Sequence, residues 1–157
     1  MNGKSIEDNV LSTFSEIAGS IGYSPLHGKI IGILLIEGVP VSLQYLAKKT
    51  GYSVPMVSLS LDLLEVLGTI KKIKKTGDRK LYVQLQGDLL EALKRAVISK
   101  VEKGIKSSLS EFEENKKRIE DLPLKNRENA KKTIDVLEKE IRRLDTYMKL
   151  LSKIRLP

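Results

Sequence analysis

Cysteine is absent from this 157-residue chain, and histidine occurs only once, as His27. Without cysteine the chain can form neither a disulfide, nor a thiolate zinc site, nor a cysteine nucleophile. A lone histidine cannot complete a transition-metal site, so we expect His27 to pack or to cap a helix. We therefore expect neither a metal nor a cofactor.

Aromatic residues make up only 4% of the chain and tryptophan is missing, so the core must be aliphatic. Long apolar runs are also lacking. The longest run, residues 30–36, is far shorter than the roughly 20 residues of a membrane helix. The first residues do not have the basic and then apolar order of a secretory signal. We expect a cytoplasmic protein without a membrane partner.

Catalytic motifs are missing as well. The chain contains no phosphate-binding loop, no GxSxG elbow and no HExxH helix. Its densest acidic cluster, Glu111, Glu113 and Glu114, lies in a highly charged segment and is typical of a solvated helix surface. We expect a protein that is not an enzyme.

Positive charge is concentrated in one short segment. Residues 1–86 carry ten Lys or Arg against seven Asp or Glu. Residues 71–80, KKIKKTGDRK, carry six of those ten cations against Asp78 alone, so the rest of this half is slightly acidic. Such focused charge favours contact with phosphates, and a solvated surface ribbon is the alternative.

Hydrophobic spacing and caps predict four helices in the first half. The first covers residues 4–21, with Ile6, Val10, Phe14, Ile17 and Ile21 on one face. Ser24, Ser42 and Ser53 are helix caps, and Pro follows Ser24 directly and Ser53 by two positions. The helices that they open end at Gly38, before Gly51 and at Gly68. A GxxxG pair, Gly28 and Gly32, indicates close helix packing.

The hydrophobic period then changes to that of strands. Residues 69–75 and 80–85 flank a Gly77-Asp78 turn, and Leu81, Val83 and Leu85 alternate strictly. This pattern predicts a β-hairpin.

Two long helices follow, separated by a break at Pro123. The first is capped by Asp88 and runs for some thirty residues, and the second begins near Asn126. The second carries a three-heptad seam that can pair within the chain or between two chains, and we favour a homodimer. The predicted dimer interface consists of Ile134, Leu137, Ile141, Leu144, Met148 and Leu151.

This order of elements predicts a mainly α fold with one β-hairpin, a winged helix–turn–helix with long C-terminal dimerisation helices. We expect an N-terminal dimerisation helix over residues 1–23, a DNA-binding domain over residues 24–86 and a helical dimerisation region over residues 87–157. In this arrangement the helix after Ser53 enters the major groove of double-stranded DNA and the basic hairpin reaches the flanking phosphates.

Residues 53–82 resemble the recognition helix and wing of MarR-like transcriptional regulators, closest to the GbsR branch. The matching positions are Val57-Ser58, Leu61-Asp62, Leu64-Glu65, Gly68, Ile70 and Gly77–Lys80, with His27–Ile30 similar too. The resemblance is dense over residues 24–86 and weak beyond them. It implies dimerisation through terminal helices, and such regulators often bind a small-molecule effector, which the sequence does not identify.

By this resemblance, one set of residues lies next to base edges or nearby phosphates: Ser53, Pro55, Met56, Ser58, Leu59 and Ser60. Arg79 enters the minor groove or contacts phosphate, with Asp78 bracing the Gly77 turn. We expect the phosphate contacts to come from Lys74, Lys75, Arg79 and Lys80, aided by Lys48 and Lys49.

One departure concerns the recognition helix itself. Residues 53–67 contain no Arg, Lys, Gln or Asn, the side chains that make bidentate contacts to G or A. We therefore expect modest base discrimination through serine hydroxyls, thymine methyl contacts and DNA shape. The same feature supports the rival interpretation, a winged helix that binds another protein in a transcription or assembly complex.

Overall fold

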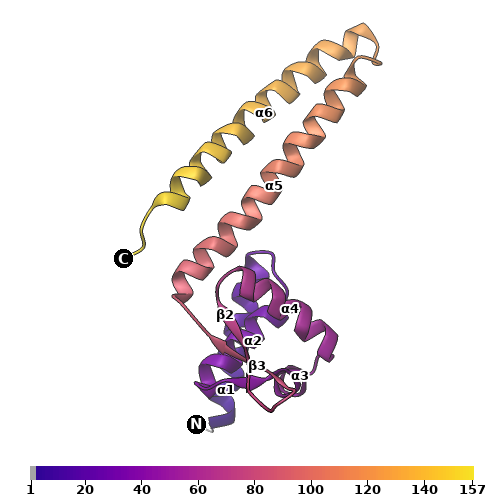
Figure 1. The fold of residues 1–157 in the computed structure, drawn as a ribbon. Coiled ribbons are helices and arrows are strands. Elements are labelled where there is room, and N and C mark those ends of the chain that lie inside the picture. The colour runs from indigo at the N-terminus through magenta and orange to yellow at the C-terminus, as the bar shows by residue number, and fades with distance from the viewer. Residues whose placement is uncertain (1–2) are drawn as a thin grey trace. The chain divides into compact units, whose positions relative to one another are not determined.

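The computed structural model describes residues 3–157, which form six helices and one three-stranded sheet. The chain divides into two compact units, Met1–Ala96 and Val97–Pro157. The elements in chain order are α1 (Gly3–Ser20), α2 (Pro25–Glu37), β1 (Val41–Ser42), α3 (Leu43–Thr50), α4 (Val54–Val66), β2 (Ile70–Lys74), β3 (Leu81–Leu85), α5 (Leu89–Ile119) and α6 (Leu124–Lys153) (Figure 1). Within residues 3–157, no helix has the length and apolarity needed to span a bilayer. The predicted mainly α class with a β-hairpin is confirmed.

Polar side chains cap the helices where the sequence predicts caps. The hydroxyl oxygens of Ser24, Ser42 and Ser53 each accept a hydrogen bond from a first-turn amide at 3.1 to 3.4 Å. The Asp88 carboxylate accepts one from the Leu90 amide at 2.7 Å. Each cap satisfies an amide that has no partner inside its helix, and so fixes where the helix begins.

Two glycines let α2 lie directly against α1. A Cβ atom on Gly28 would collide with the backbone carbonyl of Phe14, and one on Gly32 would lie 2.9 Å from Leu11 Cδ2. Any larger side chain at Gly28 would push the two backbones apart. The GxxxG spacing therefore marks close packing of two helices, as predicted.

The sheet has one strand more than the sequence predicts. The wing strands β2 and β3 pair antiparallel, with Ile70 opposite Leu85, and β1 adds to the other edge of β3, with Val41 opposite Val83. From the sequence, residues 39–41 indicate only extended backbone. Two residues are too short to show an alternating pattern, so β1 becomes visible only through its partner strand.

The core of the first unit lies between these helices and the sheet. It is aliphatic, as the scarcity of aromatic residues predicts. Its fully buried large side chains are Leu26, Ile30, Leu46, Val57, Leu61, Ile70 and Val83.

In the second unit, residues 97–119 of α5 run antiparallel to α6, and the two form a helical hairpin (Figure 1). Met148 on α6 is 4% exposed and packs with Ile98 and Ile105 of α5. Ile141 and Leu151 pack against the same cluster. The prediction that these three α6 residues face a second chain is therefore wrong, because the seam pairs with α5 of its own chain.

Polar contacts also join the two helices of this hairpin. Lys116 of α5 forms an ion pair with Glu138 of α6. At the tip, the Arg127 guanidinium donates to the carbonyls of Glu120 and Leu122, at 2.5 and 3.1 Å. Carbonyls of the connection between α5 and α6 therefore find a hydrogen-bond partner in the first turn of α6.

A second apolar stripe on α6 lies outside this intrachain core. Its side chains are exposed by between 38% and 62%: Val136, Leu137, Leu144, Tyr147 and Leu150. They occupy the sector of the helix next to the Met148 seam. We call these five residues the open face of α6.

Candidate nucleic-acid interface

The helix–turn–helix consists of α3, a turn at Gly51 and α4. Gly51 has φ 76°, a conformation that favours glycine, and its amide donates to the Ala47 carbonyl at 3.0 Å. Val57, Leu61 and Leu64 are at most 2% exposed, so the predicted core stripe of α4 is confirmed. With this stripe buried against the rest of the unit, the opposite side of α4 faces outward.

The outward side of α4 carries most of the predicted recognition residues. Ser53, Pro55, Met56 and Leu59 are exposed, Leu59 by 73% and Met56 by 52%. Ser58 is half-buried. These side chains are therefore accessible to a binding partner.

Ser60 is the exception. It is 7% exposed, so it cannot contact a duplex in this conformation, and the prediction for Ser60 is wrong. It comes three residues after Val57, and this spacing turns its side chain toward the core stripe rather than toward Leu59. The prediction came from the family resemblance and from the position of Ser60 outside the stripe of Val57, Leu61 and Leu64.

The wing turn is built around Gly77 and Asp78. Gly77 has φ 79°, and the Asp78 amide donates to the Lys75 carbonyl at 3.1 Å. The Asp78 carboxylate accepts hydrogen bonds from the Lys80 amide and from the Tyr82 hydroxyl, both at 2.9 Å. These two donors hold the pKa of Asp78 below its usual value, with the Lys80 amide contributing most. The predicted bracing role of Asp78 is thus visible in the turn.

An ion-paired lysine connects the wing to α4. Lys72 on β2 pairs with Asp62, and its Nζ lies 3.0 Å from Glu65 Oε2. The hydrogen bond to Asp62 is the main cause that raises the pKa of Lys72 above its usual value. This triad was not predicted from the sequence, although the i, i+3 spacing of the two acids places them on one side of α4.

The remaining wing cations spread over both faces of the ribbon and its tip. In the β2–β3 ladder Lys71 pairs with Gln84, and Lys74 pairs with Leu81. Because Lys71 and Lys74 are three residues apart, strand alternation places their side chains on opposite faces of the ribbon. Lys75 Nζ lies 4.0 Å from the centroid of the Tyr82 ring, a cation–π contact.

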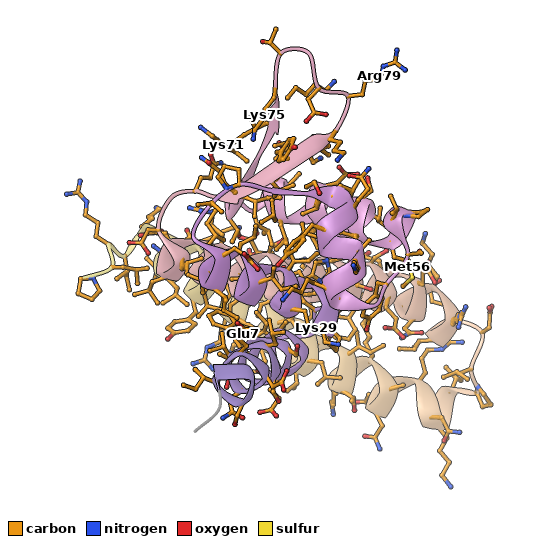
Figure 2. The ribbon with its side chains drawn as sticks, turned by 90° about the horizontal axis from the view of Figure 1, so that it is seen from below. Glu7, Lys29, Met56, Lys71, Lys75 and Arg79 are labelled. Carbon is orange, nitrogen blue, oxygen red and sulfur yellow. The ribbon has the colours of Figure 1, made fainter. Side chains whose placement is uncertain are left out.

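Arg79 extends from the tip of the wing, away from the side that carries Lys71 and Lys75 (Figure 2). Lys71, Lys74, Lys75, Arg79 and Lys80 are all exposed. In the part of the chain that the structure describes, none of these five forms an ion pair.

Lys48 and Lys49 lie in the last turn of α3, just before the Gly51 turn, and both are exposed. Lys49 Nζ lies 5.8 Å from the centroid of the Tyr45 ring. The Tyr45 hydroxyl donates to Glu37, a bond that raises the pKa of Tyr45. Two cations are thus available beside the N-terminal end of α4, and the wing supplies others.

An apolar cavity of about 300 Å³ lies within the first unit. Side chains of α1, α2, the end of α4 and the start of α5 line it, among them Phe14, Ile31, Leu64 and Leu93. His27 also borders it, with Nδ1 3.2 Å from the Ser24 carbonyl oxygen at the start of α2. This contact fits the predicted packing or capping role of His27.

Comparison with known proteins identifies the fold. No protein-family model matches the sequence, and no curated protein is similar to it. A crystal structure of a transcriptional regulator, 18% identical in sequence, matches with a TM-score of 0.54 over 94% of this chain and 99% of that chain.

Two weaker matches are described as bound to DNA. One is a mutant MepR from S. aureus bound to an oligodeoxyribonucleotide, 16% identical, with a TM-score of 0.44 over 88% of this chain and 94% of that one. The other is FabT from Streptococcus pneumoniae in complex with DNA, 20% identical, with a TM-score of 0.38 over 94% and 93%. The first match and the order of elements together show the winged helix–turn–helix fold.

Proposed function

We propose that this chain is a transcriptional regulator that binds double-stranded DNA as a homodimer in the cytoplasm, and that it is not an enzyme. The observation that carries the proposal is the exposed ribbon of five cations, whose strand β2 is joined to α4 by the ion pairs of Lys72. Phosphate contacts from basic side chains supply most of the non-specific affinity of DNA-binding proteins.

In this proposal α4 enters the major groove with its N-terminal half, and residues 24–86 form the DNA-binding domain. Lys74, Lys75, Arg79 and Lys80 contact phosphate around the Gly77 turn, and Lys48 and Lys49 do so beside the start of α4. The fold shared with a transcriptional regulator supports this assignment. The GbsR-like branch rests on the residues of the wing and recognition helix alone.

We propose that the two chains associate through the regions outside residues 24–86, and that the open face of α6 takes part. An exposed apolar stripe on a long helix is typical of a surface that a partner covers. Leu137 and Leu144 of the originally predicted interface belong to this face, and Ile134 lies half-buried beside it. Two-fold pairing would place two recognition helices on half-sites about one helical turn apart.

The apolar cavity is our candidate site for a small-molecule effector. Its size, about 300 Å³, matches the lower end of ligand pockets, and aliphatic and aromatic side chains line it. A ligand there would touch α1, α2, α4 and α5 of the first unit at once. It could therefore change how α4 is presented to DNA.

The salt dependence of binding to a random-sequence duplex tests the proposal. If each subunit neutralises about three to five phosphates, log K plotted against log salt should fall with a slope of roughly −5 to −9 for the dimer. Replacing both Arg79 and Lys80 by alanine should flatten this slope and weaken binding to all sequences alike. An unchanged slope in that variant would contradict the wing assignment.

The rival function is a protein-binding winged helix. The exposed Leu59 and Val66 favour it, at 73% and 82%, because apolar surface on an outward helix also suits a protein partner. If a gel shift at low salt detects no binding to duplex DNA, this second function is the better one.

A further inference from the structure

The side of α4 that would face DNA is apolar where such helices usually carry hydrogen-bonding side chains. Met56 and Leu59 are three residues apart and therefore neighbours on the helix surface, and Pro55 directly precedes Met56. Leu59 is 73% exposed and Met56 is 52% exposed. Both are large apolar side chains on a helix surface that faces solvent. Figure 2 shows Met56 at the periphery of the unit.

The nearest charged groups on α4 are already engaged. Asp62 and Glu65 lie beyond Leu59 along the helix, and Lys72 of the wing pairs with both. Their two negative charges are thus partly compensated by a cation of the ribbon. The N-terminal half of α4 is left with an apolar surface and two serines, Ser53 and Ser58.

The chemistry of the major groove limits what such a surface can recognise. Purine edges offer acceptors and amino groups, which need polar side chains for discrimination. The one apolar group at the floor of the groove is the C5 methyl of thymine, which 5-methylcytosine shares. An apolar side chain placed against a G·C edge would instead desolvate polar atoms without replacing their hydrogen bonds.

We propose that α4 reads C5 methyl groups in the major groove through Leu59 and Met56, so that the preferred duplexes are rich in thymine on the contacted strand. This inference rests on the proposed DNA-binding function and names the feature of DNA that it selects. We favour DNA over a protein as the partner of this apolar surface, because exposed cations flank it on both sides in the sequence. Lys48 and Lys49 precede it in the chain, and the wing follows α4.

The test compares duplexes that differ only in methyl groups. Thymine-rich duplexes of about 30 base pairs, long enough for two half-sites, are synthesised once with thymidine and once with deoxyuridine. Burying one methyl group contributes about a three- to fourfold change in affinity. If each subunit of a dimer contacts one methyl group, the wild-type protein should bind the deoxyuridine duplex roughly tenfold more weakly.

Leu59→Ala should bring the affinities for the two duplexes to within about twofold. Val66→Ala is the matched control, because Val66 is an exposed apolar residue of the same helix about 10 Å further along its axis. It should keep the full difference between the duplexes. Far-UV circular dichroism checks that both variants are folded, as expected for exposed positions.

A second arm adds methyl groups rather than removing them. Replacing cytosine by 5-methylcytosine in a G·C-rich duplex should strengthen wild-type binding and leave Leu59→Ala unchanged. Equal wild-type affinity for the methylated and unmethylated forms in both arms would overturn methyl readout while leaving DNA binding intact. If no duplex binds at low salt, the proposed function itself fails.

Discussion

Lys72 Nζ lies 3.0 Å from Glu65 Oε2 and also pairs with Asp62, so a wing lysine is bound to the recognition helix. Of the six cations in residues 71–80, this is the one whose charge is already engaged by carboxylates. It joins the two elements that the proposed function brings onto the duplex together. We infer that Lys72 positions the wing and shields the two acids from phosphate, and that it does not itself contact DNA.

Replacing Lys72 by methionine should therefore weaken DNA binding more than replacing its exposed neighbour Lys71. Both variants lose one positive charge, but only Lys72→Met leaves two carboxylates uncompensated beside the DNA-facing side of α4. At about 1 kcal/mol for each unfavourable charge contact, the two carboxylates of one subunit should lower affinity roughly thirtyfold at low salt. Fluorescence anisotropy with one labelled duplex compares the two variants.

The rescue variant makes this interpretation testable. Adding Asp62→Asn and Glu65→Gln to Lys72→Met should recover most of the lost affinity, because the exposed negative charges disappear. Thermal unfolding of Lys72→Met should differ from wild type by no more than about 1 kcal/mol, since the ion pairs are partly exposed. Failure of the rescue would make Lys72 a direct phosphate contact.

A side chain at Gly28 should destabilise the first unit. In Gly28→Ala the added methyl overlaps the Phe14 carbonyl, so α1 and α2 must separate, at a cost of about 3 kcal/mol or more. Gly19→Ala is the matched control. Gly19 is also in a helix, but no atom lies within 4 Å of its added Cβ, and alanine favours helix by up to about 1 kcal/mol. Urea unfolding should move in opposite directions for the two variants.

The wing turn should become disordered in acid. The pKa of Asp78 is lowered in the folded protein, because the ionised carboxylate accepts bonds from the Lys80 amide and the Tyr82 hydroxyl. The stabilisation is therefore complete above the usual aspartate pKa, about 3.9, and is lost as pH falls through the lower folded value. The NMR shift of the Lys80 amide should titrate in this range, and Asp78→Asn should abolish that transition.

The open face of α6 should determine the oligomeric state. A glutamate at Tyr147, which is 60% exposed within the open face, should convert a dimer to a monomer without unfolding the α5–α6 hairpin. Thr146→Glu adds the same charge at the adjacent position, turned by about 100° around the helix, and should leave the dimer intact. Light scattering after gel filtration measures both masses. A dimeric Tyr147→Glu would assign the interface to another surface, such as α1.

The helices, the wing and their caps could be predicted from the sequence because each leaves a local pattern. Ser24, Ser42 and Ser53 indicate where helices begin, and the alternation of Leu81, Val83 and Leu85 indicates a strand. These residues act through hydrogen bonds and spacings that involve their near neighbours in the chain. The structure reproduces them almost residue by residue.

Features that depend on distant partners could not be predicted in the same way. The heptad positions of α6 are apolar whether they face α5 or a second chain, so Met148 was assigned to the wrong partner. The Lys72 triad joins residues seven and ten positions apart on different elements, and its existence depends on the angle between the wing and α4. The burial of Ser60 depends on its angular position on a helix whose core side is wide.

The short strand β1 ties the segment before α3 into the sheet of the wing, through Val41 opposite Val83 and Ser42 opposite Tyr82. Because Ser42 also caps α3, a tilt of the wing would also move the start of α3, which packs against α4. We therefore expect the wing, α3 and α4 of each subunit to move together when the protein binds DNA. A ligand that regulates such a dimer would then act by changing the separation of the two DNA-binding surfaces along the duplex.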